Sequence, residues 1–224
     1  MARQLRLSLR RPTTHTRDAF VRGASNAPAL EALDAWPRWP AGALALIGPE
    51  GVGKTHLARA WAAATKAVVL DRQDPDFAAA AGRPALVEDV DQGAPDEALF
   101  HLINQAQRDG ASLLLTARAP PAAWTTALPD LRSRLNALLV AEIEAPDDEV
   151  LTGVLRNFFR ERNIRPNDDV YPYLLRRMER SIPGAQDIVR RLDETEDGQM
   201  RPVSRLLARE ILESDIENLD LFEG

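Results

Sequence analysis

One octapeptide organises this 224-residue chain: Gly48-Pro49-Glu50-Gly51-Val52-Gly53-Lys54-Thr55 matches the pattern G-x-x-x-x-G-K-[ST] of a phosphate-binding loop. It follows an apolar stretch, 44–47, that predicts a strand, and it opens a helical pattern that runs from 53 to about 64. In that setting the glycines let backbone N–H groups converge on a phosphate, and the helix adds the positive end of its dipole.

The residue types of this loop assign roles to its side chains. Lys54 supplies a point charge for the β- and γ-phosphates, and the hydroxyl of Thr55 is a ligand for Mg²⁺. The sequence therefore predicts that the chain binds ADP or ATP with Mg²⁺. The predicted nucleotide-binding positions in the loop are Gly48, Gly51, Val52, Gly53, Lys54 and Thr55.

Short apolar strands and amphipathic helices alternate after the loop. Further strands are predicted at 67–70, 85–87, 112–115 and 137–140, with a helix at 96–108. Together with the strand before the loop, this alternation predicts an α/β core in which helices cover both faces of a parallel five-stranded sheet.

After Pro146 the pattern contains helices alone, which predicts a small all-α lid domain. Its helices are expected at 147–160, 168–180, 184–192 and 204–214. The predicted organisation of the whole chain is a flexible arm at 1–12, an α/β core at 13–146, the lid at 147–214 and an acidic tail at 215–224.

Composition argues against several functional classes. The chain carries 28 Lys and Arg against 34 Asp and Glu, a net charge of −6, so its surface is unsuited to strong binding of DNA phosphates. No apolar run approaches the roughly 20 residues of a membrane span, and the start lacks the apolar region of a signal peptide. Zero cysteines and three scattered histidines argue against disulfides, thiol catalysis and a zinc site. We therefore expect a cytoplasmic protein without membrane contact.

A pair of carboxylates follows the predicted strand at 85–87. Glu88 and Asp89 stand at its carboxyl end, where a P-loop ATPase holds Mg²⁺ through water and polarises the attacking water. The usual order begins with Asp, and Glu is one methylene longer. Glu88 and Asp89 are therefore candidate catalytic residues, with Glu88 and Thr55 as the Mg²⁺ positions, in an altered geometry.

Four stretches resemble motifs of the AAA+ ATPases, and specifically of their DnaA branch. The segment 20–26, FVRGASN, is similar to the F-V-x-G-x-S-N segment that packs on the adenine, and 53–57 matches G-K-T-H-L. The segment 115–121, LTARAPP, is similar to the sensor I stretch L-T-S-D-R-P-P, and 131–135, LRSRL, to L-x-S-R-[LF]. The resemblance implies an AAA+ fold and the following roles: nucleotide contacts from Phe20, Val21 and His56, sensor positions at Thr116 and Arg118, and an arginine finger at Arg134 that acts on a neighbour's nucleotide.

The chain departs from the DnaA pattern at three positions that support hydrolysis of a protein's own nucleotide. Glu88 stands where Asp is usual, Arg118 stands where sensor I has Asp or Asn, and the sensor II arginine falls near Pro183. Arg180 is a weak replacement for that arginine. With Arg134 retained, the pattern indicates a protein that assists hydrolysis in another subunit more than its own.

The extreme start carries a separate short motif. Residues 4–9, QLRLSL, resemble the Q-L-x-L-x-L peptide by which bacterial proteins dock into the β sliding clamp, with Gln4, Leu5, Leu7 and Leu9 as the docking side chains. The leucines alternate with period two, so an ordinary edge strand is the alternative. The segment 218–222, NLDLF, resembles a shorter clamp peptide, with chance, lid packing or a self-contact as alternatives.

A DnaA-like AAA+ module with a clamp peptide resembles the Hda family. The resemblance implies a clamp-bound negative regulator of replication initiation that stimulates ATP hydrolysis by DnaA and touches DNA only through the clamp. A head-to-tail dimer or oligomer is compatible with AAA+ packing. Two alternatives remain open. One is a helicase loader or transposition helper with its own ATPase, and the other is a non-catalytic clamp-bound adaptor that sequesters DnaA.

Overall fold

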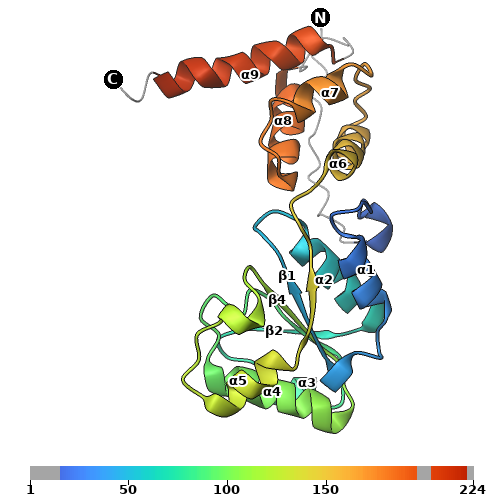
Figure 1. Cartoon of the computed structure of the whole chain (residues 1–224). Coiled ribbons are helices and arrows are strands. Elements are labelled where there is room, and N and C mark those ends of the chain that lie inside the picture. Colours follow the sequence, from blue (N-terminus) through green and yellow to red (C-terminus); the bar gives the residue numbers. More distant parts are fainter. Residues whose placement is uncertain (1–15, 196–202, 221–224) are drawn as a thin grey trace, which may run out of the picture.

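The computed structural model describes residues 16–195 and 203–220, which form a five-stranded parallel sheet and a separate group of helices (Figure 1). The sheet has the strand order β2-β3-β4-β1-β5, and every neighbouring pair of strands is parallel. The strands are β1 (Ala43–Ile47), β2 (Val68–Leu70), β3 (Ala85–Val87), β4 (Leu113–Ala117) and β5 (Leu139–Glu142).

Helices cover both faces of this sheet, because alternate residues of each central strand point to opposite sides. Ala45 and Leu115 face a core with α4, whereas Leu46 and Leu114 face a second core with α1 and α2. The helices of the core are α1 (Ala27–Asp34), α2 (Lys54–Thr65), α3 (Phe77–Ala80), α4 (Asp96–Asp109) and α5 (Pro129–Asn136), with 3-10 turns η1 (Arg17–Ala19), η2 (Pro40–Gly42) and η3 (Pro121–Ala123). The predicted parallel five-stranded α/β fold is confirmed.

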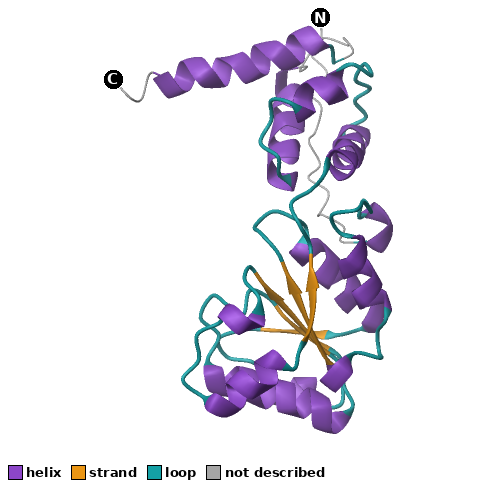
Figure 2. Cartoon of the chain, in the orientation of Figure 1, coloured by secondary structure: helices purple, strands orange, loops and turns teal. Residues whose placement is uncertain are grey.

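In its described part, the chain after β5 has helices as its regular secondary structure and has a hydrophobic core of its own (Figure 2). Leu155, Phe159 and Leu174 are buried at its centre. We call this part the lid; its helices are α6 (Asp148–Glu161), α7 (Val170–Leu175), α8 (Ile182–Thr195) and α9 (Arg205–Asp220).

Three lid helices differ from expectation in their bounds: α7 is shorter, whereas α9 and α8, which was expected at 184–192 and runs from Ile182 to Thr195, are longer. The helix predicted to reach residue 180 ends at Leu175, although the apolar spacing continues through the buried Met178. Met178 is buried from a turn, in which its N–H still reaches the carbonyl of Leu174, so periodicity alone extends the helix too far. Helix α9 was expected to end at 214 but runs to Asp220.

Within the described residues, no helix combines the length and the apolar character that crossing a membrane requires.

Candidate functional site

The carboxyl ends of three neighbouring strands gather sequence-predicted residues at one edge of the sheet. The phosphate-binding loop follows β1, Glu88 and Asp89 follow β3, and Thr116 lies near the end of β4 with Arg118 just beyond it. Because β4 lies between β3 and β1, its end stands between the two carboxylates and the loop. Such an edge is where open α/β sheets bind ligands.

Two glycines let the loop be packed from two sides. Gly51 and Gly53 have φ angles of +74° and +103°, which side chains rarely adopt. A Cβ on Gly51 would lie 2.8 Å from Cδ of Pro183, and a Cβ on Gly53 would lie 3.0 Å from Cε2 of Phe20. The loop therefore contacts the start of α8 in the lid and the N-terminal segment at the same time.

Other residues of the phosphate-binding loop either pack into the core or are exposed to solvent. Gly48 and Val52 are buried, and Val52 packs into the core cluster on the α1 and α2 side of the sheet. Thr55, in the first turn of α2, is exposed, so its hydroxyl is accessible to a ligand.

Lys54 is buried within the loop, with 7 % of its surface exposed. Its Nζ donates hydrogen bonds to the carbonyls of Gly48 and Pro49, both at 2.7 Å. Burial lowers the pKa of Lys54 from its ordinary value; Asp89 is the strongest charge acting in the opposite direction, and Arg118 adds to the lowering. The charges of Asp89, which follows β3, and of Arg118, which follows β4, therefore both act on the ammonium of Lys54.

Glu88 is held by an arginine that the sequence reasoning missed. Nε of Arg59, on α2, donates to Oε2 of Glu88 at 2.6 Å, and the two side chains form an ion pair. Its other oxygen, Oε1, is buried and has no hydrogen-bond partner among the described residues. Arg59 is four residues after Thr55, one turn along α2, and that spacing is the signal that could have found it.

Glu88 Oε1 and the exposed hydroxyl of Thr55 are oxygen donors of the kind that Mg²⁺ prefers. The residues present therefore fit the predicted ion, with Arg59 as a competing cation on Glu88.

Asp89 and Thr116 are joined through the backbone. The N–H of Asp89 donates to Oγ1 of Thr116 at 2.9 Å, and Thr116 is fully buried. Asp89 has a φ of +53°, which is unusual for a residue with a side chain and marks a sharp turn directly after β3. The sensor candidate Thr116 thus positions the second carboxylate of the pair.

Two further acids, Asp91 and Glu50, hold the loop that carries Arg118. Oδ2 of Asp91 accepts from the N–H groups of Arg118 and Ala119 at 2.8 and 3.1 Å. The Arg118 guanidinium reaches across to the phosphate-binding loop, where its Nη1 lies 2.9 Å from Oε2 of Glu50. Sequence reasoning did not single out either acid for a role, because both contacts join segments far apart in the chain.

The segment 20–26 bridges the core and the lid. Asn26 fixes its shape by accepting from the N–H of Gly23 at 3.0 Å and donating to the carbonyl of Val21 at 2.9 Å. Val21 packs so closely on Gly153 of α6 that a Cβ there would lie 2.5 Å from Cγ1 of Val21. Val21 therefore belongs to the lid contact, whereas Phe20 lies against the phosphate-binding loop.

His56 ties the start of the described chain to α2. Its Nε2 lies 2.9 Å from the carbonyl of Thr16, and its ring is 5.7 Å from that of Phe20. This predicted nucleotide-binding residue supports the position of Phe20.

The N-cap residue of α6, Asp147, accepts hydrogen bonds from both the lid and the core. Oδ1 of Asp147 accepts from the N–H of Val150 at 2.8 Å, and its Oδ2 accepts from the N–H of Ser25 at 3.1 Å. These hydrogen bonds, the Val150 bond above all, lower the pKa of Asp147 from its ordinary value.

The two arginines of the 131–135 motif lie in different environments. Arg132 donates to backbone carbonyls in and directly after η3, so it fastens that turn to α5. Arg134 is exposed on α5, and its Nη1 donates to Oε1 of Gln107 at 3.0 Å. The finger candidate is thus the more accessible of the pair.

In the lid, Arg180 forms an ion pair with Asp148 of α6 at 2.7 Å. The lid residue that lies nearest to Gly51 of the phosphate-binding loop is Pro183, and Ile182 lies near Gly53. The clamp-motif residues Gln4, Leu5, Leu7 and Leu9 lie outside the described residues, as do the last two residues of the 218–222 motif.

Comparison with known sequences finds the bacterial replication initiator DnaA, while no protein-family profile matches the chain. The chromosomal replication initiator protein DnaA of Cutibacterium acnes is 27 % identical over 228 residues, which cover 88 % of this chain and 46 % of that protein. DnaA of Flavobacterium psychrophilum is 22 % identical over 248 residues, covering 97 % of this chain and 52 % of the relative. The chain thus spans about half the length of these curated relatives.

Comparison of the fold agrees. Domain III of the Thermotoga maritima initiator DnaA superposes with a TM-score of 0.70 at 20 % identity, covering 90 % of this chain and 96 % of that one. AMPPCP-bound DnaA from Aquifex aeolicus gives a TM-score of 0.66 at 20 % identity, covering 84 % and 68 %. RuvB of Thermotoga maritima gives 0.69 at 16 % identity, covering 90 % and 72 %. The chain is therefore similar in sequence to part of the DnaA initiators and has the AAA+ fold of their domain III.

Proposed function

We propose that the chain is a nucleotide-binding negative regulator of replication initiation, which acts in trans on DnaA in the manner of the Hda family. In this proposal the phosphate-binding loop holds ADP or ATP, the N-terminal motif holds the β sliding clamp, and Arg134 acts on the nucleotide of DnaA. The chain would contact DNA indirectly, through the clamp. It would act in the bacterial cytoplasm.

The loop geometry supports the nucleotide part of the proposal. Gly51 and Gly53 shape a loop at the start of α2, where backbone N–H groups and the helix dipole favour a phosphate. Lys54 donates to two loop carbonyls and would turn to phosphate oxygens when a nucleotide binds. Thr55 and Glu88 would hold Mg²⁺, which supplies positive charge against the phosphates. The structurally similar Aquifex aeolicus DnaA binds AMPPCP.

The surroundings of the loop support slow hydrolysis by the chain itself. Glu88 is paired with Arg59, which lowers its strength as a metal ligand. Arg118 brings a cation to the position where the DnaA pattern has Asp or Asn. At the start of α8, Pro183 meets the loop where the pattern has the sensor II arginine.

Arg134 carries the proposal for the action on DnaA. Among the described residues its exposed guanidinium has one hydrogen-bond partner, the neutral Gln107, so it is available to a second protein. A guanidinium that reaches the γ-phosphate in the DnaA site stabilises the charge that develops during phosphoryl transfer. Arginine fingers raise such rates by about 10³–10⁵.

The test is ATP hydrolysis by DnaA in the presence of the chain, DNA and clamp. Arg134→Ala is expected to lower the stimulation at least about a hundredfold, because the transition-state charge loses its partner. Arg134→Lys keeps the charge without the planar fork and should restore little. Arg108→Ala, which removes another exposed arginine of the α4–α5 side, is the matched control and should stimulate like wild type.

The alternatives give different patterns in the same assay. Full stimulation by Arg134→Ala would refute the finger, and sequestration without hydrolysis would identify a non-catalytic adaptor. A helicase loader or transposition helper would show partner-stimulated hydrolysis by the chain and no loss of function on Gln4→Ala.

A further inference from the structure

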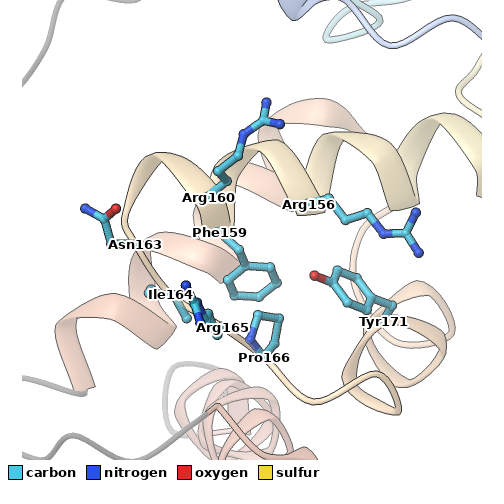
Figure 3. A pocket seen from close by; sticks show the side chains of 8 residues that line it. All are labelled: Arg156, Phe159, Arg160, Asn163, Ile164, Arg165, Pro166 and Tyr171. Atoms are coloured by element: carbon cyan, nitrogen blue, oxygen red, sulfur yellow. The ribbon is translucent and has the colours of Figure 1, made fainter.

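The outer end of the lid carries a hollow of about 450 Å³ that the proposed function does not use. It lies between the last turns of α6, the following loop and Tyr171 of α7 (Figure 3). All of its residues belong to the lid: Arg156, Phe159, Arg160, Asn163, Ile164, Arg165, Pro166 and Tyr171.

The floor of this hollow is apolar and well packed. Phe159 and Ile164 are 1 % and 7 % exposed, and the rings of Phe159 and Tyr171 meet edge to face at 6.0 Å. In Figure 3 Pro166 lies beside these rings. Phe159 and Ile164 support the floor from below, and the partly exposed Pro166 and Tyr171 are the apolar surface that a ligand side chain can contact.

The rim of the hollow is cationic. Arg156 lies over the ring of Tyr171 at 5.5 Å from its centre, and Arg160 and Arg165 complete the rim. No carboxylate pairs with these three arginines among the described residues, whereas Arg162, Arg180, Arg190 and Arg191 of the lid each have one. Arg160 donates to the neutral Oδ1 of Asn157 at 2.8 Å, so its charge is not neutralised. Guanidinium groups without a carboxylate partner around an apolar floor favour a ligand that combines carboxylates with apolar side chains.

The chain itself contains a segment of that chemistry. Residues 213–224, ESDIENLDLFEG, carry five acidic residues, no basic residue, and Ile216, Leu219, Leu221 and Phe222. The charge of this segment is opposite to that of the rim, in a chain whose net charge of −6 disfavours nucleic acid as the occupant.

The direction of α9 makes a second copy the source of this segment. Helix α9 contacts α7 and α8, and its last described buried residue is Ile211. From there it continues for nine residues to Asp220, about 14 Å, away from α6 and α7 in Figure 1. The described end of α9 thus points away from the hollow of its own chain.

We propose that the hollow binds the acidic C-terminal segment 213–224 of a second copy of this chain. Each copy has one hollow and one such segment, so the contact is heterologous and joins copies head to tail. It uses no residue of the phosphate-binding loop and is independent of nucleotide.

The test titrates the full chain into a fluorescein-labelled peptide of residues 213–224 and follows anisotropy. Arg160→Glu combined with Arg165→Glu is expected to weaken peptide binding at least about tenfold and to abolish concentration-dependent association in sedimentation velocity. Arg156 is left in place because it contacts Tyr171. Arg38→Glu combined with Arg83→Glu changes the net charge equally at exposed core positions and should bind like wild type.

Peptide variants separate the two parts of the recognition. Replacing the five carboxylates with amides, or Leu221 and Phe222 with Ser, should each weaken binding severalfold. Equal binding of the amide peptide, or of the peptide to the rim variant and wild type, would overturn the proposal. Rim-dependent binding of (dT)20 without peptide binding would overturn it in favour of a nucleic-acid site.

Discussion

Arg118 and Glu50 form the contact at residue scale with the clearest consequence for ligand choice. The ion pair spans from the end of β4 to the phosphate-binding loop, and Arg118 adds to the lowering of the pKa of Lys54 that burial causes. A cation that close to Lys54 can bind a phosphate as well as a carboxylate. In the proposed nucleotide site, Glu50 and the terminal phosphate of a triphosphate would therefore compete for the same guanidinium.

The competition predicts a change in the preference between ATP and ADP. Glu50→Gln should raise the affinity for a non-hydrolysable ATP analogue roughly twofold to fivefold while changing ADP affinity less, because the released ion pair is exposed. Arg118→Ala should remove the preference for the triphosphate. Isothermal titration calorimetry with both nucleotides measures the effect.

Glu31→Gln is the matched control, since Glu31 of α1 is paired with Arg22 at 2.8 Å and is similarly exposed. Equal shifts for ATP and ADP in Glu50→Gln would contradict the competition.

Sequence reasoning at this scale succeeded where one contiguous segment determines the geometry. The loop and the Glu88-Asp89 pair could be placed because a strand end, a turn and a helix start are local features. Glu50 on Arg118 and Asp91 on the sensor loop are tertiary contacts that no local pattern encodes. For Arg59, the one-turn spacing from Thr55 places the side chain near the loop, but its pairing with Glu88 is again a tertiary contact.

At the scale of elements, the joint between the core and α6 depends on Asp147. One carboxylate caps α6 through Val150 and also accepts from Ser25 in the segment that carries Phe20. The periodicity of the sequence predicted a helix from 147, but it could not reveal that its cap also fastens 20–26. The overlong prediction for α7 has the same origin, because apolar spacing does not register a turn whose residues stay buried.

Asp147→Ala is expected to lower the free energy of unfolding by about 1 kcal/mol, the usual cost of losing an N-cap. The folded-state pKa of Asp147 is lowered, so its stabilisation is fully present above the unfolded pKa of about 3.9 and is lost as the pH falls through the folded pKa. The stability difference between wild type and variant should therefore shrink below about pH 4, as urea titrations at several pH values will measure.

Asp76→Ala is the control for this prediction. Asp76 caps α3 through the N–H of Ala79 at 3.0 Å, and within the described part of the chain its carboxylate has no hydrogen bond to a second element. Asp147→Ala should also weaken nucleotide binding, whereas Asp76→Ala should not; equal nucleotide affinities for both variants would contradict the role of the joint.

At the scale of the whole molecule, the loop is the point where sheet, N-terminal segment and lid meet. A nucleotide bound there stabilises all three parts at once. At a concentration one hundred times Kd it should add about 2.7 kcal/mol of stability, which corresponds to roughly 5–11 °C in Tm for a chain of this size.

Tryptophan fluorescence during heating measures this shift. Trp36, Trp39 and Trp61 pack together on the α1 and α2 side of the sheet, with the rings of Trp39 and Trp61 stacked at 5.3 Å, so unfolding changes their surroundings. Lys54→Ala should abolish the shift by ADP and ATP. A nucleotide-induced shift of the same size in Lys54→Ala would contradict the placement of the nucleotide in the loop.

The contact between Gly51 and Pro183 determines how the lid can respond to the loop. Proline has no N–H and no charge, so at this point α8 can offer the loop neither a hydrogen bond nor an ionic attraction. Communication across it is steric: a change in the shape of the loop displaces the ring of Pro183 and, with it, α8. Salt screens charges and leaves such excluded-volume effects intact, so this coupling should persist at ionic strengths that abolish exposed ion pairs.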